Sequence, residues 1–342
     1  MSFKRLDQED IVISADSVTA PAWTGNAVSL TSFYTSSAQA SGLSGDYYLN
    51  VYQTTYTDST AAIQFSVGYG HVAGSGSADL NSLVDGYSPS KIVYGQYRTL
   101  VNGTEETNLS FAGTVANSIY PISVERARYK EKILPGSLSI KLTKGSDSVI
   151  LTDNSNYVTT QTFTDAGRVF ELISGSAGVK VNAAGAVDSG DLGYTNGSGS
   201  YGVLLPDAGL IILNGDALDL AKADGGINLQ TGLTNTDEAN PALIVDALNL
   251  GDLFTLRSEE TVSSNYVFVR ARNSEFNYST NPSNITGSGE LRHSVMIDSP
   301  QAYITAVGLY NDNNDLLAIA KLSRPLLKDF TKEALIRIKL DY

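Results

Sequence analysis

The sequence predicts a mainly β protein, built of antiparallel sandwich-type domains with a few short helices. Many short segments alternate apolar and polar residues, which is the pattern of half-buried strands. Tyrosine is frequent and tryptophan rare, at 19 and 1 residues, and there are 31 glycines. This composition suits strands joined by tight turns. Apolar residues make up 42% of the 342 residues, so the chain can bury a core and is not disordered.

The alternating segments place the expected strands. The clearest of them are 48–52, 63–67, 139–142 and 336–342. Two further runs, 266–270 and 302–307, are denser in apolar residues and are expected to lie deeper. Asn-Gly pairs at 102–103, 196–197 and 214–215 are hairpin signals. The polar run Asn311–Asp315 lacks the glycine and terminal glutamate of a calcium-binding loop, and it is expected to be a hairpin tip.

Helices are expected to be few and short. Residues 216–221 form one candidate, stopped by Gly225 and Gly226. Residues 240–248 form a stronger one, because Asn240 can cap the first turn, Pro241 suits that turn and Gly251 suits the end. A single helical turn is expected within residues 79–85.

The distribution of charge predicts the domain organisation. Residues 145–256 hold 14 acidic and three basic side chains, whereas the basic segments 121–144 and 321–342 carry net charges of +4 and +3. We therefore expect a β domain at 1–144, an acidic middle domain at 145–256 that is inserted in the chain, and a C-terminal β segment at 257–342 that packs with the first domain. The acidic middle is either a solvated surface or a face that meets basic faces of neighbouring subunits.

Composition excludes several classes of site. The chain has no cysteine and only two histidines, His71 and His293, which we expect to be structural or surface residues. Thiolate chemistry, Cys-ligated zinc and iron–sulfur clusters are therefore excluded. The net charge of −13 argues against nucleic acid as a partner. No run of 18 apolar residues exists, so no membrane insertion is expected. We find no catalytic constellation and expect neither a metal nor a cofactor.

Three segments are the candidates for contact with other subunits. The first is the basic segment Arg126–Lys132, which contains one aromatic residue, the second is the stretch Asn273–Asn281, and the third is the terminal strand Leu335–Tyr342. Their candidate contact residues are Arg126, Arg128, Tyr129, Lys130, Lys132, Glu275, Phe276, Tyr278, Arg337, Lys339 and Tyr342. For strand interiors among them, a place in the core is the alternative.

Several motifs resemble one family of proteins. They are SGDYYLNVY at 44–52, IVYGQYR at 92–98, ERARYKEKILPG at 125–136, FVRARNSEFNYSTNP at 268–282 and the YITAVGLYN…LAIAK pair within 302–325. Together these stretches resemble virion structural proteins of large contractile-tailed phages, in particular cyanophage-like myoviruses. The resemblance is weakest in residues 145–235, and none of its motifs is catalytic.

The resemblance implies a structural role. It implies a non-enzymatic subunit of the phage virion, most of all of the tail or baseplate, assembled in the host cytoplasm and in contact with other tail proteins and with copies of itself. The alternative is a tail-fibre or neck-associated adhesin that binds host surface glycans. A chain without cysteine is compatible with assembly in a reducing compartment.

Overall fold

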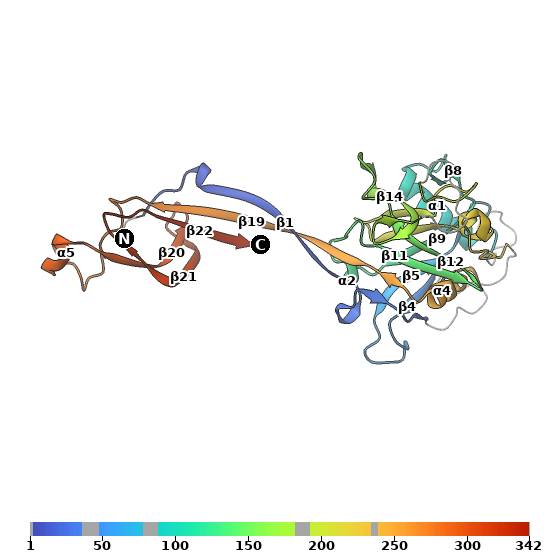
Figure 1. The fold of residues 1–342 in the computed structure, drawn as a ribbon, viewed down its shortest axis with the longest axis horizontal. Coiled ribbons are helices and arrows are strands. Elements are labelled where there is room, and N and C mark those ends of the chain that lie inside the picture. The colour runs from blue at the N-terminus through green and yellow to red at the C-terminus, as the bar shows by residue number, and fades with distance from the viewer. Residues whose placement is uncertain (1–2, 36–47, 78–87, 182–191, 234–238, 342) are drawn as a thin grey trace. The chain divides into compact units, whose positions relative to one another are not determined.

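The computed structural model describes residues 3–35, 48–77, 88–181, 192–233 and 239–341, and these form two compact units (Figure 1). Unit 1 combines Met1–Ser17 with Thr261–Tyr342, and unit 2 is Val18–Glu260. The division falls inside two strands, β1 (Ile11–Pro21) and β19 (Arg257–Ala271). The predicted fold class is confirmed, since the chain is mainly β with antiparallel sheets and short helices.

Unit 2 contains one large antiparallel sheet. Its strand order is β2-β18-β11-β12-β14-β16-β17-β9-β5-β4-β3, with β13 and β15 beside β14 and β6 beside β9. The bounds are β2 Ser29–Leu30, β3 Tyr34–Thr35, β4 Tyr48–Tyr52, β5 Ile63–Gly68, β6 Gly70–His71, β9 Ser118–Val124, β11 Ser139–Lys144, β12 Asp147–Asp153, β13 Thr162–Thr164, β14 Gly167–Ser176, β15 Val179–Lys180, β16 Gly202–Leu205, β17 Leu210–Asn214 and β18 Phe254–Thr255. The hairpin β7 (Ser110–Phe111) and β8 (Thr114–Val115) stands apart from it, and β10 (Lys132–Ile133) pairs with β19.

The large sheet is covered on both faces. Along β17, Ile211 and Leu213 belong to one core cluster, whereas Leu210 and Ile212 belong to a second. Successive side chains of a strand point to opposite faces, so this run of apolar residues supplies two cores at once. The larger core also takes inward residues from most other strands, as expected of a curled sheet that closes around its own inner face.

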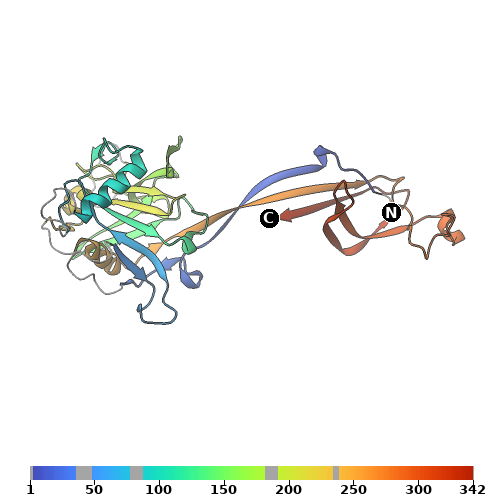
Figure 2. The ribbon, with the colours of Figure 1, turned by 180° about the vertical axis from the view of Figure 1, so that it is seen from behind.

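One helix lies over each core. The helix α4 (Ala239–Gly251) packs on β11, β4 and β5 and contributes to the larger core. The helix α1 (Pro89–Asn102) packs beside β6, β9 and β13, with Tyr94 in the smaller core. In Figure 2, which views the molecule from the side opposite to Figure 1, α1 lies in front of the strands of unit 2. Shorter helices are α2 (Arg126–Tyr129), α3 (Gly215–Asp219) and the 3₁₀ turns Thr24–Asn26 and Lys222–Asp224.

Unit 1 contains two small antiparallel sheets. In the first, β19 lies beside β1 and pairs with β22 (Ala334–Asp341) over eight residue pairs. The second is the hairpin of β20 (Ala302–Tyr310) and β21 (Leu316–Lys328). A 3₁₀ turn at Gln8–Asp10 and the helix α5 (Ser294–Asp298) complete the unit. Among its described residues the buried apolar side chains are Val267, Ala271, Ala334 and Ile338.

Most of the expected strands and helices are confirmed. The expected strands at 48–52, 63–67, 139–142, 266–270, 302–307 and 336–341 are present, the helices at 216–221 and 240–248 correspond to α3 and α4, and Asn311–Asp315 is the tip of the β20–β21 hairpin. The helical turn expected within 79–85, like Tyr342, lies outside the described residues.

Three local expectations are wrong. Residues 302–307 do not lie deep, because β20 has no buried residue. Asn102-Gly103 ends α1, with Gly103 in the left-handed region at φ 68°. Asn214 caps α3 and accepts a hydrogen bond from the Ala217 amide, so it does not begin a hairpin. Asparagine and glycine favour helix ends as well as hairpin turns, and the pair alone does not distinguish them.

The units also differ from the expected domains. Residues 145–256 are not a unit of their own, because β11 and β12 pair across position 144 and β17 pairs with β9. The acidic stretch is therefore part of the same sheet as residues 18–144. The C-terminal segment forms its unit with the first 17 residues alone.

Candidate interaction surfaces

The side chains of the basic segment Arg126–Lys132 make most of their contacts within unit 2. The Arg126 guanidinium lies 5.1 Å from the centroid of the Tyr129 ring, and Arg128 donates a 2.6 Å hydrogen bond to Thr24 Oγ1. Tyr129 is buried, and its hydroxyl donates to the Ala208 carbonyl at 3.1 Å. These contacts fix α2 against the body of the unit and leave Tyr129 unable to reach a partner.

The acidic partner of this segment lies in the same chain. Lys130 Nζ is 2.5 Å from Glu260 Oε1, and Lys132 Nζ is 3.8 Å from Glu259 Oε2. The register of β10 with β19, in which Lys132 lies opposite Glu259, brings the two charges together. Both pairs are partly exposed, so each contributes at most about 1 kcal/mol.

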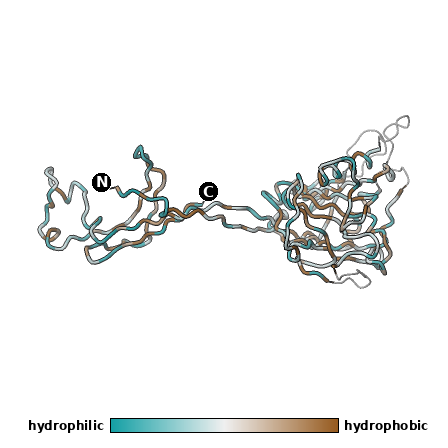
Figure 3. The backbone as a smooth tube through the Cα atoms, turned by 90° about the horizontal axis from the view of Figure 1, so that it is seen from above, coloured by the Kyte–Doolittle hydropathy of each residue, from teal (hydrophilic) through white to brown (hydrophobic). Residues whose placement is uncertain are grey.

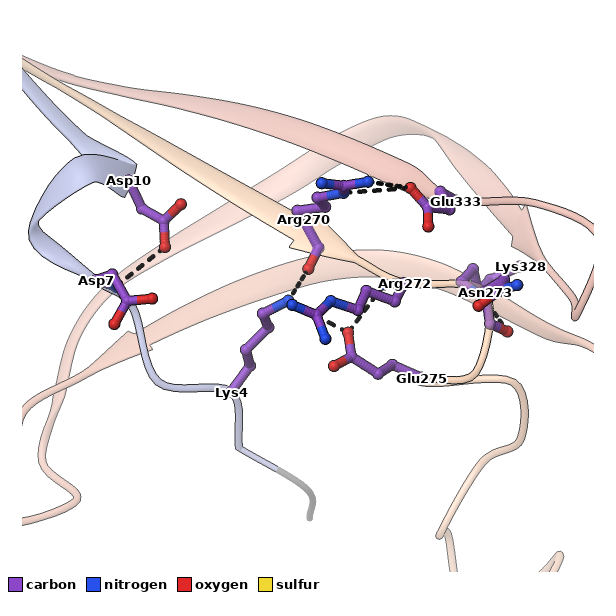
Figure 4. A network of polar contacts seen from close by, with 9 residues as sticks. All are labelled: Lys4, Asp7, Asp10, Arg270, Arg272, Asn273, Glu275, Lys328 and Glu333. Carbon is purple, nitrogen blue, oxygen red and sulfur yellow. Dashed lines mark hydrogen bonds and ion pairs between the residues drawn. The ribbon is translucent and has the colours of Figure 1, made fainter.

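Segment 273–281 surrounds a buried ammonium group in unit 1. Lys328 is fully buried, and its Nζ donates to the Asn273 carbonyl at 3.2 Å, to Asn277 Oδ1 at 2.6 Å and to the Asp329 carbonyl at 2.9 Å. Figure 4 shows Lys328 beside Asn273, at the end of β19. A buried charge is tolerated only with such partners, so the lysine fixes the loop on β21.

The same segment holds the N-terminal residues of unit 1. Glu275 Oε2 accepts hydrogen bonds from the Arg272 amide at 2.9 Å and from Lys4 Nζ at 3.3 Å (Figure 4). The Arg272 amide is the main reason that the pKa of Glu275 is lowered, with Lys4 adding to it. Phe276 adopts a left-handed φ of 56°, and Tyr278 is 52% exposed. Of the three candidate contact residues Glu275, Phe276 and Tyr278, Tyr278 is the one whose side chain is exposed.

The terminal strand already has a partner within its own unit. β22 pairs with β19 from Ala271↔Ala334 to Ser264↔Asp341. Lys339 Nζ lies 3.1 Å from Asp341 and 3.2 Å from Asp16, and the hydrogen bonds that it donates to these carboxylates raise its pKa. The Arg337 guanidinium lies 5.4 Å from the Tyr266 ring centroid. Any neighbour must therefore meet the other edge of β22 or its exposed side chains.

A surface that the sequence reasoning did not select is the β20–β21 hairpin. Its large apolar side chains are exposed, with Tyr303 at 64%, Leu317 at 69% and Ile319 at 57%. The Phe3 ring packs edge-on against Tyr310 with centroids 5.2 Å apart, and Phe3 itself is 59% exposed. The apolar stretches along the strands of unit 1 are visible in Figure 3. The signal in the sequence was the absence of any charge in Ala302–Tyr310.

Three titratable groups of unit 2, His71, Asp216 and Asp219, have hydrogen-bond partners within the unit. His71 Nδ1 accepts hydrogen bonds from the Ala73 and Ser75 amides, and burial lowers the pKa of the imidazole. Asp216 accepts from the amide and the hydroxyl of Ser118, which ties α3 to β9. Burial raises the pKa of Asp219, whose Oδ1 accepts from the Thr231 amide. These hydrogen bonds tie the loop after β6 and the segments around α3 to their neighbours.

Two other features are absent from the part of the chain that the structure describes. No three His, Asp or Glu side chains gather there as a metal-ligand set. Equally, no helix in the described ranges has the length and apolar composition needed to cross a bilayer.

Comparison with known proteins yields no relative. No protein family, curated protein or solved structure matches the chain.

Proposed function

We propose that this chain is a non-enzymatic structural subunit of a phage virion, belonging to the tail and most of all to the baseplate, and that it acts through its interfaces. The observation that carries the proposal is the exposed apolar surface of unit 1. In its described residues four apolar side chains are buried, whereas long apolar side chains on β1, β20, β21, β22 and α5 are exposed.

A unit of this kind is poorly stabilised in isolation. A domain of about 100 residues normally buries well over half of the surface that its unfolded chain exposes. Unit 1 has no core cluster in its described residues, since both clusters belong to unit 2. A two-stranded hairpin such as β20–β21 is marginally stable in water unless further strands or a packed face support it. The missing stabilisation is supplied when the unit is covered by neighbouring subunits.

The composition of this surface also favours association. Exposed apolar patches larger than a few hundred Å² mark interaction sites. The exposed tyrosines Tyr278, Tyr303 and Tyr310 have an apolar ring and a polar hydroxyl, which suits them to protein–protein interfaces. The assignment to a phage tail, in contrast, rests on the resemblance of the five motifs described above.

The proposal is tested on purified contractile-tailed particles from the source of the gene. We expect peptides of this chain in the particles, and density for it in a ring around the tail axis in a cryo-electron microscopy map, with unit 1 covered by neighbours. If the chain is absent from the particles, the virion assignment is wrong. If it occupies a peripheral spike and the full chain binds host envelope glycans, the adhesin alternative replaces the baseplate proposal.

A further inference from the structure

The side chains of Lys328 and Asn277 meet inside unit 1. Lys328, at the end of β21, is fully buried, and Asn277 is 3% exposed. The two residues lie 51 positions apart in the chain, and Lys328 Nζ donates a 2.6 Å hydrogen bond to Asn277 Oδ1. The structure therefore holds a primary amino group against a carboxamide, away from water.

One backbone oxygen fixes the orientation of the carboxamide. The Asn273 carbonyl accepts a hydrogen bond from Asn277 Nδ2 at 2.7 Å and another from Lys328 Nζ at 3.2 Å. If the amide were turned over, Nδ2 would lie against Nζ, and both groups are donors. The carbonyl side of the amide therefore faces the amino group, and the same main-chain oxygen contacts both nitrogens.

The amino nitrogen and the amide carbon are close to the separation at which a bond forms. A C=O bond adds about 1.2 Å to the 2.6 Å between Nζ and Oδ1, so Asn277 Cγ lies at most about 3.8 Å from Lys328 Nζ. Reacting atoms approach from about 3–3.5 Å, and groups held at such a distance react as if they were extremely concentrated. A carboxamide that is inert in solution can therefore be attacked here.

No carboxylate neutralises Lys328 closely. Within the described ranges no acidic oxygen lies at ion-pair distance from its Nζ. The pKa of Asp329 is lowered mainly by the Thr331 hydroxyl and that of Glu333 mainly by Arg270, with Lys328 last among the causes in both cases. A buried charge without a paired counter-charge is costly, and conversion of the amino group into an amide would remove that cost.

The reaction between the two side chains needs no further reactant. The ammonium group loses one proton, the amine attacks Cγ, and an electron pair of the C=O bond moves to Oδ1. When the carbonyl group forms again, the bond from Cγ to Nδ2 breaks, and Nδ2 leaves as ammonia with a second proton from Nζ. In water the ammonia takes up the first proton, so the products are one neutral amide and one ammonium ion.

Unit 1 is the part of the chain in which a covalent link has the largest effect. Four apolar side chains are buried among its described residues, and the chain has no cysteine that could form a disulfide. A link between residues 277 and 328 closes a loop whose ends are 51 positions apart, and it constrains the unfolded chain as a disulfide does. The link buries no additional apolar surface, so it supplements a core without replacing one.

We propose that Lys328 and Asn277 form an intramolecular isopeptide bond between Nζ and Cγ, with release of ammonia. The hydrogen-bonded contact in the structure is the arrangement that precedes the bond. The proposal goes beyond the virion function, because the bond forms within the folded unit whatever the chain assembles with.

The mass of the purified full-length chain tests the bond directly. Loss of ammonia lowers the mass by about 17 Da, and we expect this deficit in the denatured parent chain after incubation at neutral pH. Lys328→Met keeps the apolar stem and removes the nucleophile, whereas Asn277→Ala removes the carboxamide, so each variant should have the mass of its sequence. Lys321→Met, at an exposed lysine of the same strand, is the matched control and should keep the deficit.

Tryptic peptides locate the bond. Trypsin does not cleave after an acylated lysine, so peptide 273–292 should be recovered joined to peptide 322–332. An unlinked chain yields 273–292, 322–328 and 329–332 as separate peptides, since Arg324 precedes a proline and is not cleaved. Cyclisation of an Asn-Gly pair such as Asn196-Gly197 also releases ammonia, but it joins no two peptides.

The decisive outcomes do not depend on the folding of any variant. A parent chain that has the mass of its sequence and yields the three peptides separately overturns the proposal. A mass deficit that maps to an Asn-Gly pair, or one that persists in Lys328→Met, overturns it as well. None of these results alters the particle test of the virion assignment. Conversely, the joined peptides from a chain that is absent from virions would support the isopeptide bond and overturn the virion role.

Discussion

The carboxyl group of Glu171 on β14 is largely removed from water and has two hydrogen-bond partners. Its two oxygens accept hydrogen bonds from the Ser200 hydroxyl and, at 3.3 Å, from the Ala112 amide. Burial is the largest influence on this group and raises its pKa, although both hydrogen bonds act in the opposite direction. The folded protein therefore holds the proton of Glu171 more tightly than the unfolded chain does.

This raised pKa predicts how stability depends on pH. The contribution of Glu171 is fully present below the unfolded pKa of about 4.5 and is lost as the pH rises through the higher folded value. Glu171→Gln keeps the shape and removes the titration. We expect the variant to gain stability relative to the parent as the pH rises from 5.5 to 8.5, measured by urea unfolding at each pH. A difference in stability between Glu171→Gln and the parent that stays constant with pH would contradict this.

Individual contacts were the part of the site least accessible from sequence. The basic character of Arg126–Lys132 was evident, but its partners Glu259 and Glu260 lie more than 120 residues away and meet it through the β10–β19 register. Lys328 likewise reads as one more surface base, and only the fold shows that it is buried under Asn273 and Asn277. Residue type predicts a capacity for contact, and the register of distant strands decides whether that contact is internal.

At the scale of elements, the sequence predicted strands better than helices. Strands such as β4 and β5 were found because alternation is a local signal that a half-buried strand must carry. The longest helix, α1, was missed because exposed and polar residues interrupt its apolar pattern in the sequence. Tyr94 is buried and Tyr97 and Val101 pack against the smaller core, but Ile92 is 52% exposed and Gly95 breaks the run of apolar residues. Pro89 at the start and Gly103 after the end are residues typical of helix ends. Because Asn102-Gly103 was interpreted as a hairpin turn, these residues were not recognised as the limits of a helix.

A glycine-to-alanine substitution should have opposite effects on stability in the two helices that cover the large sheet. In α1, a Cβ at Gly95 meets nothing within 4 Å, so Gly95→Ala should stabilise unit 2 by about 0.5–1 kcal/mol through helix propensity. At the end of α4, a Cβ at Gly251 would lie 1.9 Å from the Lys141 carbonyl oxygen of β11. Gly251→Ala must therefore push α4 off the sheet, and we expect a loss of more than about 2 kcal/mol. Urea midpoints of the two variants test this, and a Gly251→Ala midpoint equal to or above that of the parent would show that α4 does not pack on β11 in this way.

On the scale of the whole molecule, charge was a misleading guide to the division of the chain. The acidic stretch 145–256 is real as a composition, but its strands alternate with those of residues 18–144 in one sheet. Sheet topology depends on pairings such as β17 with β9, which composition does not encode. What the charge does separate is the two units, because unit 1 is almost neutral and unit 2 carries nearly the whole net charge. That contrast is consistent with one unit that associates and one that remains solvated.

The two units should unfold in separate transitions, because unit 2 contains both core clusters and unit 1 buries four apolar side chains among its described residues. Trp23, the single tryptophan, is buried in unit 2 between Phe65 and Phe254, and its Nε1 donates to the Phe254 carbonyl at 2.7 Å. Its fluorescence therefore reports unit 2 alone, whereas far-ultraviolet circular dichroism reports the strands of both. We expect a first dichroism transition at low urea, at which the fluorescence does not change. We expect a second dichroism transition at higher urea that coincides with the change in Trp23 fluorescence. If unit 1 is stabilised by the association that we propose, the first midpoint should rise with protein concentration and the second should not. One coincident transition, independent of concentration, would mean that unit 1 has a core of its own, and the argument for an assembly subunit would lose its basis.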